Sequence, residues 1–378
     1  MAGDVTPLFR TPEPLDFRGP GNPYFLTPAL AAELTCRLPG LLAARPAGAE
    51  AAVATLCDLL GLPPQCVAAG NGSSELAAWI DHLLVPGSYA VPVPAAGRWT
   101  ARPLRTGRRV DMFPLQESCG FALDLARYTE FIRSRDASAA VVCTPNDPDG
   151  HALTRHALVR FMDDLADLDL LVIDESHLEF ADPGDGDPSV VQDAVLRPNV
   201  VVLRSLGTGL GLPGARLGHL VANPALTARV RAALPERNLN SLAEHLIRLV
   251  HQHTAAYRQS TALVRRDRRD MAARLRTLPG LTVYPSHSNF LLVRLPVGAE
   301  GTLVRDRLFA EHGVLVRECG DRIGSSSRFL RLAVRPEPDV RHLVSALAQV
   351  LLAPGYSSGT AAVDRLVSET NGAGLRVG

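Results

Sequence analysis

The stretch RSLGTGLGLPGARLG, from Arg204 to Gly218, shows the pattern from which the fold can be predicted. It begins where the short apolar run Val200–Leu203 ends, and it continues with polar residues and glycines. Continuous Val, Ile and Leu without alternation are typical of strands buried on both faces of a parallel sheet. Four further apolar runs end in the same way: Val67–Ala69, Tyr89–Val93, Ala139–Cys143 and Leu170–Ile173.

Helical patterns lie between some of these runs. Glu75–Leu84 places Leu76, Ile80 and Leu84 on one face, and a second helix presents Leu158, Phe161, Met162 and Leu165. Repeated alternation of strands and helices predicts an open α/β sheet. Ligands bind beyond the carboxyl ends of the strands in such sheets, so we expect the polar segments after the five runs to form a site.

The pattern changes after about Pro235. Ser241–Leu278 predicts one long, arginine-rich helix, and the segments LTVYP, NFLLVRL and RFLRLAVR predict strands of a smaller α+β unit. We therefore expect a large cofactor-type domain over 46–235 and a small domain over 236–353. Residues 1–45 are expected to contribute to the small domain and the substrate site, and the Gly/Ser-rich 354–378 to form a flexible tail.

Composition excludes several classes of protein. Of the 378 residues, 46% are apolar and 21% are charged, which is typical of a soluble globular chain with a large core. A formal net charge of zero does not favour a nucleic-acid partner. No run is long enough to span a membrane, and the polar, proline-rich Met1–Arg18 does not resemble a signal peptide. Six cysteines without a CxxC pair favour a reduced, cytoplasmic protein.

All 39 basic residues are arginine, and the chain contains no lysine. A chain of this length ordinarily carries on the order of twenty lysines. A GC-rich genome would lower that number, but in either case no lysine amine of this chain can reach any site. The histidines of HQH, His251–His253, do not predict a metal site, because residues at i and i+2 of a helix point apart.

Seven motifs together resemble one family of enzymes. They are NPYFLTP (Asn22–Pro28), GNGSSE (Gly70–Glu75), TPNDPDG, VIDESHLEF, RSLGTGLGLPGARLG, SHSNFLL and FLRLAVR. In order and spacing they resemble the class I/II aminotransferases of pyridoxal phosphate (PLP) fold type I, in the branch of histidinol-phosphate aminotransferase and threonine-phosphate decarboxylase. The resemblance implies a large domain with a mostly parallel sheet of the seven-stranded type and a small α+β domain. It also implies a dimer and an amino-acid-like substrate.

The resemblance implies roles for the matching residues. Asp174 would hold the pyridine nitrogen and keep the ring protonated as an electron sink. Arg216 would bind the cofactor phosphate together with the helix N-terminus at Gly72, Ser73 and Ser74. Trp99 would stack on the ring, Arg331 would bind the substrate carboxylate, and Asn22 and Tyr24 lie in the substrate segment. Simpler alternatives are a strand-end Asp174, a helix cap at Ser73, a core Trp99 and a surface pair of Arg331 with Arg335.

Other positions depart from the family pattern. Thr208 stands where the family has the lysine that holds PLP, and Gly207 replaces the neighbouring serine. His177 replaces a tyrosine and Asp147 an asparagine near the ring hydroxyl. Arg45 replaces a tyrosine that reaches the partner subunit's phosphate, and His219 replaces an aromatic residue. Because the changes cluster, we favour a rebuilt site over a decayed one.

These departures leave three hypotheses open. In the first, the chain binds PLP or pyridoxamine phosphate (PMP) without a covalent link. It then runs lyase, decarboxylase, dehydratase or condensation chemistry, with His177, or failing that His219, as the base. In the second, it is a PLP-independent enzyme that reuses the anion pocket with Asp147, His177 and Thr208. In the third, a non-catalytic chain pairs with a lysine-bearing homologue in place of a homodimer.

Overall fold

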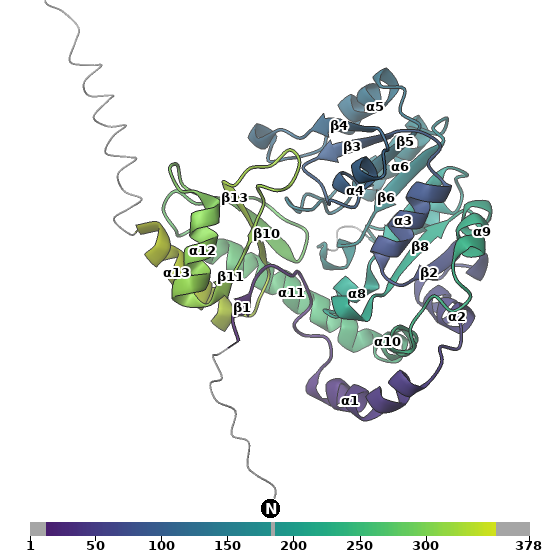
Figure 1. Cartoon of the computed structure of the whole chain (residues 1–378), viewed down its shortest axis with the longest axis horizontal. Coiled ribbons are helices and arrows are strands. Elements are labelled where there is room, and N and C mark those ends of the chain that lie inside the picture. The colour runs from purple at the N-terminus through teal and green to yellow at the C-terminus, as the bar shows by residue number, and fades with distance from the viewer. Residues whose placement is uncertain (1–12, 183–185, 353–378) are drawn as a thin grey trace, which may run out of the picture.

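The computed structural model describes residues 13–182 and 186–352 (Figure 1). Its centre is a seven-stranded sheet in the order β2-β8-β7-β6-β5-β3-β4. The strands are β2 (Val67–Gly70), β3 (Tyr89–Val93), β4 (Val110–Pro114), β5 (Ala139–Cys143), β6 (Leu170–Asp174), β7 (Val200–Arg204) and β8 (Gly218–Ala222). β8 runs antiparallel to both of its neighbours, and the other pairs are parallel. This confirms the predicted fold class and all five predicted strands, whereas β4 and β8 were not predicted.

Both faces of this sheet are buried, which explains the continuous apolar runs. Along β7, Val200 and Val202 face one core and Val201 and Leu203 face the other. The first core is covered by α2 (Ala49–Leu60), α5 (Leu125–Ser134), α6 (Arg155–Asp164), α7 (Val191–Ala194) and α10 (Ser241–Gln252). The second core is covered by α3 (Ser73–Leu83) and α9 (Pro224–Ala233). Shorter elements are α4 (Ala101–Arg105), α8 (Leu206–Gly209), η1 (Pro64–Cys66), η2 (Glu117–Cys119), η3 (Leu178–Phe180) and η4 (Pro213–Ala215).

The small unit has its own antiparallel sheet in the order β12-β13-β10-β9. Its elements are β9 (Thr282–Val283), β10 (Phe290–Arg294), β12 (Arg317–Glu318), β13 (Phe329–Ala333), α12 (Gly301–His312) and α13 (Glu337–Leu352). Near the N-terminus, β1 (Leu15–Asp16) pairs in parallel with β11 (Val314–Leu315), and Phe17 is buried in the small unit's core. The chain then crosses to the large unit, where α1 (Pro28–Ala43) packs against α10. The predicted tail at 354–378 lies outside the described residues.

The predicted single helix Ser241–Leu278 is wrong, because the structure has two helices there. α10 ends at Gln252, His253 leaves the helical conformation, and α11 (Thr254–Leu275) follows. Residues from Leu239 to Tyr257 belong to the core of the large sheet, and Val264 and later residues belong to that of the small unit. The two cores therefore divide within α11, which runs from one unit to the other (Figure 1), later than the predicted boundary at 235.

Two negative findings concern the described ranges. None of the helices there combines the length and the apolar character needed to cross a bilayer. No three His, Cys, Asp or Glu side chains are grouped there in a way that could hold a metal ion.

Candidate functional site

The segments that follow the parallel strands meet at one edge of the large sheet and form a small cavity of about 150 Å³. We call it the anion cup. Its lining includes the first turn of α3 on one side and the glycine-rich loop on the other: Gly72, Ser73, Ser74, Arg98, Ser205, Gly207, Thr208 and Arg216. The first N–H groups of a helix have no partner within it, and together with the helix dipole they favour an anion.

Two glycines allow the close packing of the cup. Gly72 has φ of +91°, and a Cβ atom there would lie 2.7 Å from a guanidinium nitrogen of Arg216. A Cβ at Gly218 would lie 2.4 Å from the backbone nitrogen of Ser73. Arg216 itself has φ of +52°, an uncommon conformation for a residue with a side chain. The Arg216 guanidinium therefore lies against the N-terminus of α3, and phosphate binding there stays a prediction.

Arg98 extends from the cup to Asp174. Its Nη1 donates to Ser73 Oγ at 2.9 Å, and its Nε forms an ion pair with Asp174 Oδ2 at 3.1 Å. The Asp174 carboxylate also accepts from the Trp99 indole N–H at 2.7 Å and from the Ser176 backbone N–H at 3.0 Å. Asp174 is 2% exposed, so its buried charge depends on these three partners from its own chain.

Trp99 lies in the core of the sheet. It is fully buried, and its ring packs edge-on against Tyr89 at a centroid distance of 6.4 Å. These contacts favour the alternative of a core tryptophan, and stacking on a cofactor ring stays a prediction.

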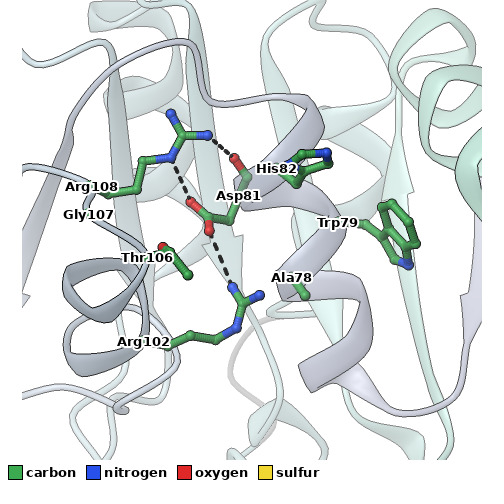
Figure 2. A pocket seen from close by; sticks show the side chains of 8 residues that line it. All are labelled: Ala78, Trp79, Asp81, His82, Arg102, Thr106, Gly107 and Arg108. Atoms are coloured by element: carbon green, nitrogen blue, oxygen red, sulfur yellow. Dashed lines mark hydrogen bonds and ion pairs between the residues drawn. The ribbon is translucent and has the colours of Figure 1, made fainter.

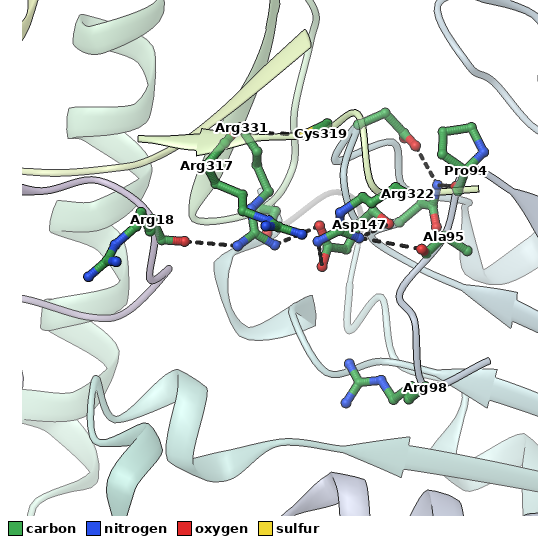
Figure 3. A network of polar contacts seen from close by, with 12 residues as sticks. Arg18, Pro94, Ala95, Arg98, Asp147, Arg317, Cys319, Arg322 and Arg331 are labelled. Carbon is green, nitrogen blue, oxygen red and sulfur yellow. Dashed lines mark hydrogen bonds and ion pairs between the residues drawn. The ribbon is translucent and has the colours of Figure 1, made fainter. Parts of the chain in front are cut away.

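A second cluster, which we call the Asp147 clamp, joins the large and small units (Figure 3). Arg331 Nη1 donates to Asp147 Oδ1 at 2.7 Å, and Arg322 Nη2 donates to Asp147 Oδ2 at 3.0 Å. The guanidinium groups also bond to backbone oxygens, Arg331 to Arg18 at 2.9 Å and Arg322 to Ala95 at 3.4 Å. Burial alone would raise the pKa of Asp147, but the two arginines hold it well below its usual range. Arg331 is thus a buried ion-pair residue, with Asp147 as its anion.

His177 follows Asp174 by three residues and is 7% exposed. Its ring is within electrostatic range of Arg98, Asp174, Asp147 and Arg331. It also packs edge-on against Phe290 at 5.2 Å. Burial lowers the pKa of His177 to about 4, opposed by Asp147 and reinforced by Arg98 and Arg331. The imidazole is therefore neutral at pH 7, which makes it a weak base.

His219 occupies a different environment. It lies in β8 opposite Arg204 of β7, and it is not among the residues that line the cup. Burial and the nearby Arg204 charge lower its pKa to about 3, and neither ring nitrogen finds a hydrogen-bond partner within the described ranges. The contacts do not place His219 where it could act on a molecule in the cup.

The other predicted site residues are divided between the cup and more distant contacts. Thr208 lines the cup and lies 2.8 Å from Ser205 Oγ. Asn22 donates to the Gly209 carbonyl at 3.0 Å and to Ser260 Oγ at 2.8 Å, so it fastens the N-terminal segment to the glycine-rich loop and α11. Tyr24 donates to Asp267 of α11. Arg45 is exposed just beyond the end of α1 and does not line the cup.

Sequence analysis missed Arg98 and Arg322. Arg98 could have been noticed, because it directly precedes Trp99 in the segment that follows β3. Arg322 lies in a Gly/Ser-rich loop without any pattern, and its bond to Asp147 spans 175 residues.

Comparison with known proteins identifies the class to which this fold and site belong. The family model Aminotransferase class I and II matches residues 45–347, and the chain belongs to this family. Members of the family are PLP-dependent enzymes and are usually dimeric.

Three relatives and one solved structure illustrate the similarity. The protein y4rO of Sinorhizobium fredii is 32% identical over 87% of this chain and 53% of its own length. CMP-5'-(3-aminopropyl)phosphonate synthase of Streptomyces rubellomurinus is 29% identical over 80% of this chain and 47% of its own length. L-serine phosphate decarboxylase of Sulfurospirillum multivorans is 26% identical over 78% of this chain and 76% of its own length. A decarboxylase structure from the same organism superposes with a TM-score of 0.82 at 23% identity, covering 89% of this chain and 88% of the other. The chain spans about half the length of the first two relatives.

The site fits PLP only in part. The anion cup suits a phosphate group. A pyridine ring between the cup and Asp174 would have to lie where the Arg98 guanidinium now bridges Ser73 and Asp174. Asp174 already has three partners, and the chain has no lysine to hold the cofactor covalently. The ring half of PLP does not fit this arrangement of side chains.

Proposed function

We propose that this chain is a non-transaminating member of the family that binds the phosphate group of a small phosphorylated molecule in the anion cup. The observation that carries the proposal is the position of Arg98. One guanidinium group pairs with Asp174 and reaches Ser73, so it fills the space that a cofactor ring would need and leaves the cup open.

The charges of the cup support a phosphate ligand. Arg98 and Arg216 supply two positive charges, and Asp174 balances one of them. One positive charge remains, together with the N-terminus of α3, which itself favours an anion. Arginine forks bind two phosphate oxygens at once, so the cup suits a phosphate monoester better than a single carboxylate.

The described side chains do not favour proton transfer of the kind that transamination needs. Thr208 offers a hydroxyl bonded to Ser205, and Asp147 is bonded to two arginines instead of to His177. The names of relatives, L-serine phosphate decarboxylase and threonine-phosphate decarboxylase, point to phosphorylated amino-acid-like molecules as the ligand class.

Calorimetric titration with inorganic phosphate and with PLP tests the proposal. We expect saturable phosphate binding, and PLP binding of similar strength that phosphate competes away. Arg216→Ala should weaken both by roughly tenfold to a hundredfold, because a hydrogen bond to a charged group contributes about 1.5–3 kcal/mol. Arg102→Ala, which removes an arginine outside the cup, serves as the control. Failure of the wild type to bind phosphate would contradict the proposal.

A second candidate is an enzyme that holds PLP or PMP non-covalently for decarboxylation or related chemistry. The pairing of Asp174 with the cup at one sheet edge favours it, as do the decarboxylase relatives. It requires the Arg98 side chain to leave Asp174 when the cofactor binds. Wild-type binding of PLP at least about a hundredfold tighter than phosphate, a difference of about 2.7 kcal/mol, with a change in the PLP absorbance spectrum, would favour this candidate.

We propose that the chain forms a homodimer through α1. This helix is rich in leucine and alanine, yet Leu30 is its one buried residue, and Leu42 is 75% exposed. An apolar helix face of this kind marks an interaction surface. Light scattering should show a dimer for the wild type and a monomer for Leu42→Glu. A wild-type monomer that dimerises only with a lysine-bearing homologue would instead support a non-catalytic partner chain.

A further inference from the structure

We infer that Asp174 is a positioning residue of the anion cup, because it fixes the guanidinium group of Arg98 beside the space where the anion binds. The inference rests on the proposed phosphate site and deepens it by stating how one of its arginines is kept in place. It gives Asp174 a role other than the one implied by the family resemblance, in which this carboxylate holds a pyridine nitrogen.

The Arg98 guanidinium is held through Nη1 and Nε. Nη1 donates to Ser73 Oγ at 2.9 Å in the first turn of α3, and Nε forms the ion pair with Asp174 Oδ2 at 3.1 Å. Among the residues that the structure describes, Nη2 of Arg98 has no hydrogen-bond partner. A guanidinium group carries several N–H donors in a rigid fork. Because Arg98 lines the cup, the N–H groups that remain are available to an anion there.

Asp174 is itself held firmly in place. It ends β6, and its carboxylate accepts from the indole N–H of the fully buried Trp99 at 2.7 Å and from the Ser176 backbone N–H at 3.0 Å. The Asp174 side chain is 2% exposed, whereas that of Arg98 is 19% exposed. The carboxylate is therefore the fixed partner of the ion pair, and it orders a side chain that lies closer to solvent. An arginine that is already ordered loses less conformational entropy when an anion binds.

The charge of Asp174 has two opposite effects on an anion in the cup. It repels the anion directly, and it attracts and orders Arg98, which favours the anion. While Arg98 is present, the ion pair neutralises the carboxylate, so the ordering of Arg98 is the larger effect. Without Arg98, only the repulsion remains. Removing the charge of Asp174 should therefore weaken anion binding only in a chain that retains Arg98.

Calorimetric titration with inorganic phosphate tests this dependence on the wild type, Asp174→Asn, Arg98→Ala and the double variant. Arg98→Ala should lower the affinity by roughly tenfold or more, because a hydrogen bond to a charged group is lost. Asp174→Asn keeps the shape of the side chain and removes its charge, so it should lower the affinity of the wild type by roughly threefold to tenfold. In the Arg98→Ala background, the same change should leave the affinity unchanged or raise it.

Asp81 offers a matched control (Figure 2). Like Asp174 it is a buried carboxylate paired with arginine, since Arg102 and Arg108 each lie at 3.3 Å from its oxygens. It lines a separate pocket that shares no residue with the cup. Asp81→Asn should therefore leave the phosphate affinity unchanged, which separates the positioning of Arg98 from the general effect of losing a buried charge.

The outcomes are distinguishable. If the wild type does not bind inorganic phosphate, the proposed function itself fails. If phosphate binds but Asp174→Asn does not weaken it, or weakens it equally in both backgrounds, the inference is overturned and the cup remains. If a variant does not fold, a crystal structure of the wild type with phosphate decides, and Arg98 should then contact the phosphate and Asp174 together. A phosphate bound without contact to Arg98, or an Arg98 side chain that has left Asp174, would overturn the inference.

Discussion

The anion cup and the Asp147 clamp both involve the segment after β3, yet the cup is open and the clamp is closed. The cup presents the N-terminus of α3, Arg98 and Arg216 to a cavity. The clamp also contains two arginines, but Asp147 supplies their anion from within the chain. The same type of residue therefore attracts a ligand in one place and holds two units of the fold together in the other, and the difference is the source of the counter-ion.

The local backbone explains why the cup stays open. Gly72 lines the cup and Gly218 packs against Ser73 next to it, and a Cβ atom at these positions would collide with Arg216 and Ser73 respectively. A larger residue at either position would displace Arg216 or the first turn of α3, so both glycines preserve the arrangement of the cup. In the clamp, by contrast, the carboxylate at position 147 lies between the two guanidinium groups and supplies their anion.

The largest expected effect comes from supplying an amine beside the cup. Thr208→Lys should form no covalent PLP adduct by itself, because Arg98 holds the space of the ring. Thr208→Lys with Arg98→Ala should form an adduct, since lysine amines react with the PLP carbonyl. Borohydride reduction followed by mass spectrometry of the intact protein measures the difference, from almost no adduct to most of the protein.

Thr208→Met with Arg98→Ala controls for side-chain length without an amine. An adduct with Thr208→Lys alone would contradict the claim that Arg98 fills the space of the ring, because it would show that this space is as open as the cup.

A smaller effect concerns the sheet beneath the cup. His219 follows Gly218, which touches Ser73, but it does not line the cup itself. Its pKa in the fold is about 3, below the ordinary value of 6.5, so the unfolded chain binds more protons between these values. Stability is therefore lost as pH falls from 6.5. Between pH 7.5 and pH 5 the charge of His219 should lower the free energy of unfolding of the wild type by about 2 kcal/mol, at 1.36 kcal/mol for each pH unit below 6.5. His219→Phe should not show this decrease.

Urea unfolding of the wild type and His219→Phe at both pH values gives this difference, with the exposed His251→Phe as the control. Phosphate affinity of His219→Phe at pH 7.5 should equal that of the wild type. If the free energies of unfolding of the wild type and His219→Phe differ by the same amount at both pH values, the fold does not hold the buried imidazole neutral.

The parallel strands could be predicted because each is a continuous apolar run that ends at a polar or glycine-rich segment. Two strands were not predicted, and each has a physical reason. β4 is an edge strand whose residues are only partly buried, so its apolar pattern is weak. β8 directly follows the Arg216 loop and runs antiparallel, which the alternation of strands and helices does not predict. The break at His253 was missed because the arginine-rich pattern continues across it.

What the sequence by itself determined is the order of the motifs, the glycines and Arg216 of the cup, and the absence of any lysine. These are local or compositional properties, and they are visible without a fold. Only the tertiary structure decided that Arg98 bridges Ser73 and Asp174, and that Asp147 is the anion for Arg322 and Arg331. The latter two bonds span 175 and 184 residues, so they depend on how the large and small units pack, which no neighbouring residues encode.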